Sequence, residues 1–164
     1  EVADDVLTAA GYEWYEVSNW AKPGQECRHN RCYWDQDDYL AVGCAAHVHT
    51  DGVRWWNVRT PERYIDAIGR GADPEAGREE LDSRARAEER LTLALRTRWG
   101  ARCAAVADAE IADLVAQGLV IRADDRIVLT RRGRMLASEV TARLLLAGAA
   151  PDRPPDPVGS IGGP

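Results

Sequence analysis

One stretch decides the fold of the second half of the chain: Gly118-Leu-Val-Ile-Arg-Ala-Asp-Asp-Arg-Ile-Val-Leu-Thr-Arg-Arg-Gly133. Two short runs of branched apolar residues flank the turn at Asp124-Asp125, which is the pattern of a β-hairpin. Gly118 is typical of the end of a preceding helix, and Thr130 is typical of the cap of a following one. The stretch therefore predicts a two-stranded wing between two helices.

The helices around this hairpin complete a familiar order. Apolar side chains at helical spacing predict a long helix from Ser83 to Gly100 and a second helix over about 108–117. A last helix is predicted over about 131–146. Helix, helix, wing and helix is the order of a winged helix, so residues 82–146 are predicted to form a winged-helix-like α+β domain.

The first part of the chain follows an α/β pattern. A helix over 4–10 stops at Gly11 and is followed by a strand over 12–17, which is one αβ step. The remaining predicted elements are a long polar loop, a short buried strand, a hairpin around Asp51-Gly52 and a helix that begins at Thr60-Pro61, at residues 18–38, 39–43, 47–58 and 60–68.

Charge divides the chain into two parts. Residues 1–81 carry 8 basic and 16 acidic side chains, whereas residues 82–146 carry 12 basic and 9 acidic ones. We predict an α/β part at 1–70 and a linker at 71–81, which is rich in glycine and charged residues. The segment 147–164 holds five of the eight prolines and is predicted to be a disordered tail.

A winged helix raises the question of DNA binding, which the charges do not favour. The net charge is −6, and residues 104–120, which include the predicted groove helix, contain Asp108, Glu110 and Asp113 but no basic side chain. Carboxylates placed there would repel phosphates, so we expect no nucleic-acid partner. A DNA-binding winged-helix protein stays an alternative because of three arginines near the wing: Arg131, Arg132 and Arg134.

The composition also limits the cellular compartments in which the protein is expected. The sequence has no apolar run of about 18 residues and no signal-peptide pattern in its first 30 residues. Its four cysteines do not form the framework of a secreted disulfide protein. We expect a cytoplasmic protein without a transmembrane segment, and peripheral membrane contact stays open. The chain opens within an amphipathic run without a methionine, which indicates a piece of a longer protein.

Chemically versatile side chains concentrate between Cys27 and His49. This stretch holds all three histidines and three of the four cysteines, which are possible ligands for zinc or an iron–sulfur cluster. The spacing from Cys27 to Cys32 matches no compact metal knuckle, so binding of a metal ion alone is the weaker interpretation. Trp55 and Trp56 are predicted to be packing residues.

The same stretch resembles a known family. The matching segments are Tyr15-Glu-Val-Ser-Asn-Trp-Ala-Lys-Pro-Gly24, Glu26-Cys-Arg-His-Asn-Arg-Cys-Tyr-Trp34 and Asp38-Tyr-Leu-Ala-Val-Gly43. They resemble the C-terminal half of the HemW-type heme chaperones, which are related to oxygen-independent coproporphyrinogen III oxidase. The core of the resemblance is His29-Asn30-x-x-Tyr33-Trp34. Residues 1–70 would then be the terminal strands of a radical S-adenosylmethionine partial β/α barrel.

The resemblance implies cofactors that this chain alone does not hold. Full-length members carry a [4Fe-4S] cluster on a Cys-x3-Cys-x2-Cys triplet, and no such spacing occurs here, so enzymatic activity is left undecided. The element Gly-x-Gly-Ala-x-Ser appears as Gly43-Cys-Ala-Ala-His-Val48. Gly43, Ala46 and His47 are therefore the candidate residues for the S-adenosylmethionine side, with two departures from the family pattern.

The resemblance implies heme as a ligand and heme-accepting proteins as partners. His29 is the candidate ligand of the heme iron, because a neutral imidazole is a common axial ligand. Asn30 would orient this imidazole, Tyr33 and Trp34 would cover a porphyrin face, and Arg28, with Arg31, would pair with propionates. We expect a C-terminal fragment of a heme chaperone; the alternatives are a coproporphyrinogen III oxidase and a DNA-binding protein.

Overall fold

The computed structural model describes residues 1–148, so the predicted tail at 147–164 lies almost entirely outside the described residues. The elements of the first part are α1 (Val2–Ala9), β1 (Glu13–Glu16), β2 (Asn19–Ala21), α2 (Arg28–Trp34), β3 (His47–Thr50), β4 (Val53–Asn57), α3 (Pro61–Gly69) and β5 (Glu75–Glu80). Those of the second part are α4 (Ser83–Leu95), β6 (Ala101–Arg102), the 3₁₀ turn η1 (Cys103–Ala105), α5 (Asp108–Ala116), β7 (Val120–Ala123), β8 (Arg126–Leu129), α6 (Arg131–Met135) and α7 (Ala137–Leu146).

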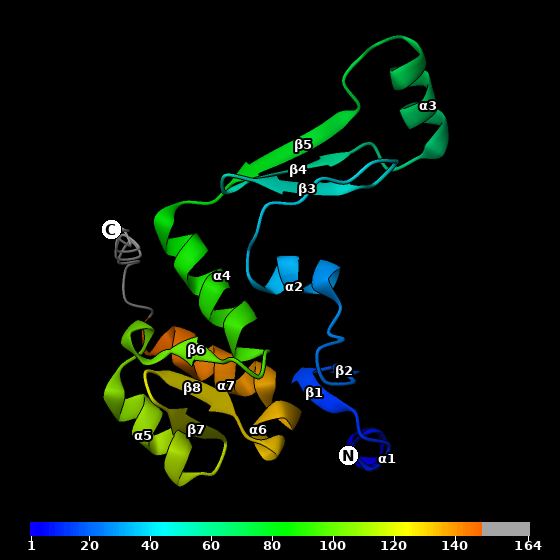
Figure 1. Ribbon diagram of the computed structural model, residues 1–164. Helices are drawn as coiled ribbons and strands as arrows, with labels where there is room; N and C mark the ends of the chain where they lie inside the picture. Colours follow the sequence, from blue (N-terminus) through cyan, green and yellow to red (C-terminus); the bar gives the residue numbers. More distant parts are fainter. Residues whose placement is uncertain (149–164) are drawn as a thin grey trace, which may run out of the picture.

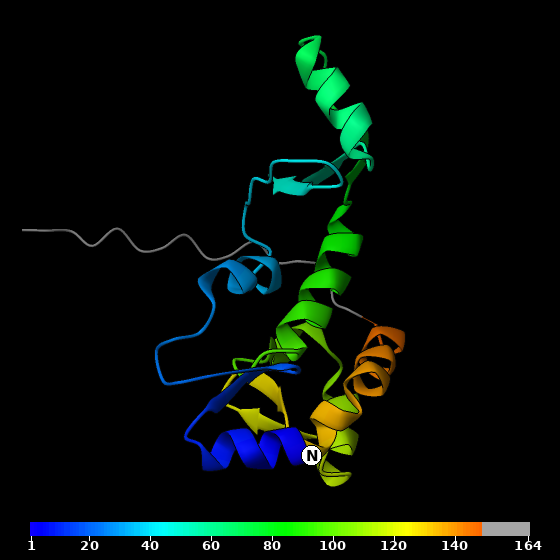
Figure 2. The same ribbon diagram turned by 90° about the vertical axis from the view of Figure 1, so that its right-hand side faces the viewer.

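Helix α4 connects two bodies of the molecule (Figure 1). At one end it leads from the three-stranded sheet β3-β4-β5, beyond which α3 projects. At the other end it packs against the sheet β6-β8-β7 and against α7. Figure 2 shows the molecule elongated along α4, with α2 beside that helix and α1 near the sheet β6-β8-β7. The short helix α2 is thus held between the two bodies.

The hydrophobic core lies in the second part. The core cluster runs from Leu91 of α4 to Leu144 of α7, and Leu95, Leu114 and Ile127 within it are fully buried. Among residues 1–80, the buried apolar side chains are only Tyr15, Ala21 and Val48. The helical spacing of apolar residues in α4, α5 and α7 explains this, because each helix presents one apolar stripe to the sheet.

The predicted linker contains a strand. Within 71–81, β5 pairs antiparallel with β4, and Gly77 lies opposite Trp56. An added Cβ at Gly77 would lie 2.8 Å from the Trp56 ring, so the indole packs where that side chain is missing. The sequence concealed this strand because β5 lies at the edge of its sheet and carries charged residues, as edge strands do.

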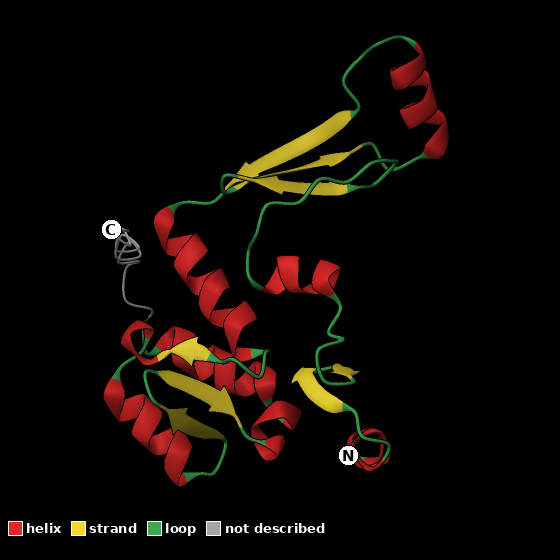
Figure 3. Cartoon of the chain, viewed as in Figure 1, coloured by secondary structure: helices red, strands yellow, loops and turns green. Residues whose placement is uncertain are grey.

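Other predicted elements also differ. The polar loop at 18–38 contains β2 and α2, and the buried strand expected at 39–43 is a loop (Figure 3). Only Tyr39 makes a bridge, with His49, while Leu40 and Val42 are 80% and 89% exposed. A buried strand needs cover on both faces, and no element among residues 1–148 covers these two side chains.

The strands in the described part of the chain have only antiparallel partners. Every strand pair among residues 1–148 is antiparallel, so no two of these strands are parallel neighbours of the kind that a β/α barrel joins by crossovers. The chain is therefore a mixed α/β structure without a parallel pair in its described part.

The long helices are shorter than predicted. The helix expected from Ser83 to Gly100 ends at Leu95, because the backbone after it pairs with β1: Val17 N–H donates to Arg96 O (2.9 Å) and Arg98 N–H donates to Tyr15 O (3.1 Å). The helix expected over 131–146 is interrupted at Leu136, whose φ of −115° is not helical. None of the helices in 1–148 has the length and apolar character needed to cross a bilayer.

A buried ion pair attaches α1 to α6. Asp4 is 6% exposed and accepts two hydrogen bonds of 3.0 Å from Arg134. The Trp20 indole N–H donates to the same carboxylate (2.9 Å), and Arg131 lies 2.8 Å away. Burial by itself raises the pKa of Asp4, but the hydrogen bonds from Arg134 and Trp20 outweigh burial, so the pKa lies below its ordinary value.

Candidate functional site

The exposed face of α2 carries a histidine and a tyrosine one turn apart. His29 and Tyr33 are four residues apart and therefore lie on the same face of the helix. The Tyr33 hydroxyl is hydrogen-bonded to His29 Nε2 at 3.1 Å, and the two rings meet edge to face with centroids 5.0 Å apart. Both side chains are exposed. The imidazole is thus accessible to a ligand, and its outer nitrogen is oriented by a phenol.

A row of aromatic rings continues from this pair into the sheet. The Tyr33 ring packs on Tyr39 with centroids 4.5 Å apart, and Tyr39 lies 5.9 Å from the ring of His49. His49 is 8% exposed, and its Nδ1 is hydrogen-bonded to Asp37 O at 3.1 Å. Burial raises the pKa of Tyr39. The Tyr33 ring therefore rests on Tyr39, and the His29 ring in turn rests on Tyr33.

The other residues of the motif have different surroundings. Trp34 is half-buried and packs edge to face on Tyr15 at 5.8 Å, which is a packing contact. Asn30 is half-buried and makes no side-chain hydrogen bond to His29, because adjacent residues of a helix point in different directions. Tyr33, not Asn30, orients the imidazole. Arg28 is exposed and takes part in no ion pair among residues 1–148.

Arg31, in contrast, is engaged. Its guanidinium lies over the Trp99 ring, 4.7 Å from the centroid, and 3.7 Å from the carboxylate of Asp35. Burial raises the pKa of Asp35, and the charge of Arg31 partly opposes this. Of the two arginines expected to face an anionic ligand, only Arg28 is left uncommitted.

The segment 43–46 forms a separate tight turn that leads into β3. Gly43 has φ +113°, and Ala45 has φ +57°, which is unusual for a residue with a Cβ. Asn57 Nδ2 donates to Gly43 O (2.9 Å), and Asn57 N–H donates to Ala46 O (3.0 Å), so the turn is tied to the end of β4. His47 is exposed and stacks on Trp56, with ring centroids 5.8 Å apart.

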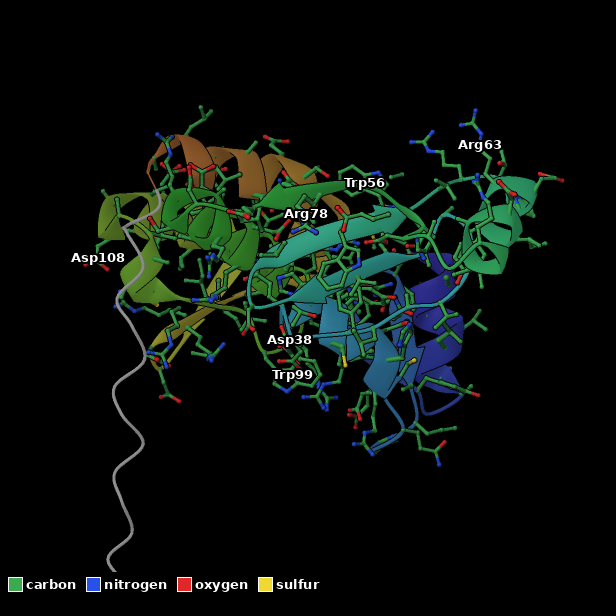
Figure 4. All side chains as sticks on the ribbon, turned by 90° about the horizontal axis from the view of Figure 1, so that it is seen from above. Asp38, Trp56, Arg63, Arg78, Trp99 and Asp108 are labelled. Atoms are coloured by element: carbon green, nitrogen blue, oxygen red, sulfur yellow. The ribbon has the colours of Figure 1, made fainter. Side chains whose placement is uncertain are left out.

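The structure does not bring all predicted site residues together. His29, Tyr33 and Arg28 share α2, whereas Gly43, Ala46 and His47 lie near Trp56, and Figure 4 shows Trp99 beside α2 and well away from Trp56. Within the described part of the chain, no group of three or more His, Cys, Asp or Glu side chains is arranged to hold a metal ion. The four cysteines are free.

Sequence reasoning missed several residues around α2. The sequence predicts a strand at Tyr39 and a helix at Trp99, and it gives no indication of a role for Gln36 or Glu89. Gln36 Nε2 donates to Glu89 Oε2 at 2.8 Å, across 53 residues of sequence. No local pattern reveals such a pair, although the clustering of aromatic residues around the motif was a usable indication for Tyr39.

Comparisons with known proteins show which proteins the chain resembles. Residues 81–136 match the HemN C-terminal domain family. The heme chaperone HemW of Mycobacterium tuberculosis is 43% identical over 148 residues, which are 88% of this chain and 38% of that protein. HemW of Bacillus subtilis is 30% identical over 156 residues, covering 88% of this chain and 41% of that protein. The chain thus spans less than half the length of these relatives.

A solved structure shares the fold. Coproporphyrinogen III oxidase (HemN) from Escherichia coli, described as a radical SAM enzyme, superposes with a TM-score of 0.66 at 15% identity, covering 87% of this chain and 39% of that chain. At this identity the likeness concerns the fold alone. The family follows from the sequence matches over most of the chain: the chain belongs to the HemW-like family and corresponds to the C-terminal part of its members.

Proposed function

We propose that this chain binds heme on α2 and serves a heme chaperone that passes heme to acceptor proteins. The observation that carries the proposal is the accessible His29–Tyr33 pair at 3.1 Å, in a chain whose relatives are named heme chaperones. Heme is cargo in this function, so the site has to bind it and also release it. The cytoplasmic location stays a prediction from the sequence.

The residues of α2 suit heme in charge and shape. The exposed His29 imidazole offers nitrogen to the iron, as proximal histidines do. The Tyr33 ring, which is 39% exposed, offers apolar surface to a porphyrin face, and Arg28 is available for a propionate. Trp34 is held by Tyr15 and contributes mainly by keeping the helix on its support.

The fit to S-adenosylmethionine is poorer. Ala45 stands at φ +57° where the family element has a glycine, and Val48, which replaces a serine, is 4% exposed and so packs inside. The chain also lacks the cysteine triplet of the cluster. We therefore assign the [4Fe-4S] cluster and S-adenosylmethionine only to full-length relatives, and the alternative function, coproporphyrinogen oxidation, gains no support from residues 43–48.

We also propose a winged-helix-like domain at 82–146 that does not bind DNA. Two of the three arginines near the wing are occupied, since Arg131 binds the carboxylate of Asp5 and Arg134 binds that of Asp4. Helix α5 presents acidic side chains, two of which are held by Arg143. This leaves little positive charge to replace the counterions of DNA.

His29→Ala is expected to weaken heme binding at least about tenfold, because the axial bond to iron is lost while the aromatic surface remains. The Soret band should shift at the same time, since the iron changes its ligand. Titration of the chain with hemin, followed by absorbance, measures both effects.

His49→Ala and His47→Ala are the matched controls. His49 is buried and His47 is the first residue of β3, away from α2, so both variants should keep the wild-type spectrum. An unchanged spectrum in His29→Ala, or loss of heme only in one of the other two variants, would refute the assignment of the ligand.

Tyr33→Phe is expected to bind heme about twofold to tenfold more tightly, with the wild-type Soret band. Coordination through Nε2 requires the imidazole to give up its bond to the Tyr33 hydroxyl, and a net hydrogen bond contributes about 0.5–1.5 kcal/mol. Phenylalanine keeps the ring on Tyr39. Hemin titration next to Tyr39→Phe, whose hydroxyl makes no hydrogen bond among residues 1–148, tests this; weaker binding or a changed spectrum would contradict it.

A further inference from the structure

We infer that Glu89, Arg98 and Trp99 are positioning residues that hold α2 in its orientation for heme binding. All three belong to the part of the chain that matches the HemN C-terminal domain family, so this domain would act as the support of the heme site. The inference rests on the proposed function, because it concerns the same site. Below we call these three residues the α2 support.

The first contact secures the start of α2. Arg98 donates to Glu26 Oε1 at 2.7 Å, and the Glu26 side chain is 12% exposed. Glu26 directly precedes Cys27, the N-cap residue of α2. The other arm of the Arg98 guanidinium binds Glu13 of β1 at 2.8 Å. A guanidinium fork between two carboxylates fixes direction as well as distance, so the chain enters α2 at a defined place.

The second contact lies at the middle of the helix. The guanidinium of Arg31 stands over the Trp99 ring at 4.7 Å, and that of Arg98 stands 5.2 Å from the same ring centroid. Cations over an indole are attracted by its π electrons, and tryptophan is the best ring for this. Trp99 therefore joins the first contact to the second, and Figure 4 shows it beside α2.

The third contact secures the end of the helix. Gln36 follows the C-cap residue Asp35 and has φ +54°, so the chain turns sharply here. Its amide donates to Glu89 Oε2 at 2.8 Å, while Glu89 Oε1 accepts from Arg54 of β4 at 2.8 Å. Glu89 thus joins the turn after α2 to α4 and to the neighbouring sheet.

Helix α2 needs such support because it is too short to be stable without contacts to other elements. It has only 7 residues, and none of them is buried. Isolated helices shorter than about 12 residues are marginal in water. The rings of Tyr33 and Trp34 add contacts to Tyr39 and Tyr15, but the α2 support acts before, along and after the helix. The direction of His29 is therefore set largely by the C-terminal domain.

The test combines variants of the α2 support with a variant of His29, the proposed ligand of the heme iron. Trp99→Leu is expected to weaken hemin binding about threefold to tenfold in the full chain, and Trp99→Phe should retain most of the affinity because the ring remains. Glu89→Gln, at the other end of α2, should weaken binding to a smaller extent. In a His29→Ala background, Trp99→Leu should have no further effect, because a positioning residue acts through the group it positions.

Controls separate this role from general stability. Arg84→Met, on the exposed side of α4, should leave hemin affinity unchanged, and all variants are compared at a temperature where circular dichroism shows them folded. Trp99→Leu with wild-type affinity, or with the same loss in the His29→Ala background, would overturn the inference while the proposed function stands. If the wild-type chain binds no hemin at all, the proposed function itself fails, and the inference fails with it.

Discussion

Gly133→Ala should remove a large fraction of the stability of the C-terminal domain. An added Cβ at Gly133 would lie 1.8 Å from Leu119 O and 2.9 Å from Leu119 C, which are backbone atoms that cannot rotate away. The same carbonyl accepts a hydrogen bond from Thr130 N–H at 3.0 Å, and Thr130 caps α6 by accepting from Gly133 N–H at 2.9 Å. The added methyl group would force α6 away from the backbone at Leu119, and this movement would break the hydrogen bond from Thr130 N–H to Leu119 O.

The expected loss in the free energy of unfolding is about 3 kcal/mol or more, which is a large fraction of the stability of a small domain. Urea unfolding followed by circular dichroism measures it. Gly69→Ala is the matched control, because Gly69 lies in α3 with open space around its Cβ position. That variant should be as stable as the wild type or slightly more stable. Equal urea midpoints for Gly133→Ala and wild type would contradict the close packing.

Arg134→Met should destabilise the chain by about 3 kcal/mol, the low end of the cost of breaking a buried ion pair. The Asp4 carboxylate would lose its two hydrogen bonds from Arg134 while it stays 94% covered by α6 and its neighbours, since Asp4 is 6% exposed. Arg131 still lies 2.8 Å away, which limits the loss. The guanidinium of Arg134 also lies over the Trp14 ring, so the substitution removes this packing contact as well.

Urea unfolding again measures the change, with Arg84→Met as the control, because an ion pair between exposed side chains contributes little to stability. The double variant Asp4→Asn/Arg134→Met should recover part of the loss, because no buried charge is then left alone. If Arg134→Met and Arg84→Met had equal effects, the buried pair would contribute nothing beyond a surface contact.

The same pair gives the stability a definite pH dependence. The pKa of Asp4 is lower in the folded than in the unfolded chain, so the ionised carboxylate stabilises the fold. This contribution is present in full above the ordinary aspartate pKa of about 3.9 and is lost as the pH falls through the lower native pKa. The difference in stability between wild type and Asp4→Asn should therefore shrink in acid.

The differences between sequence expectation and structure have a common origin. The hairpin β7–β8 was predictable because Asp124-Asp125 and its branched neighbours specify local dihedral angles. The strand β5 was not, because its charged residues show no alternation and its place depends on the free edge of β4. Likewise, α2 has no apolar stripe that would distinguish its sequence from a loop.

The sequence by itself determined the helices α4 and α5 and the hairpin β7–β8 of the second half, the acidic character of α5 and the motif from His29 to Trp34. These features depend on residue type and on spacings within one turn or one hairpin, which the chain carries locally. Only the tertiary structure decided that Asp4 meets Arg134 across 130 residues, that Glu89 holds Gln36, and that Tyr33 rather than Asn30 orients His29. The physical reason is that direction and burial of a polar side chain depend on which elements pack beside it, and packing is settled by the chain as a whole.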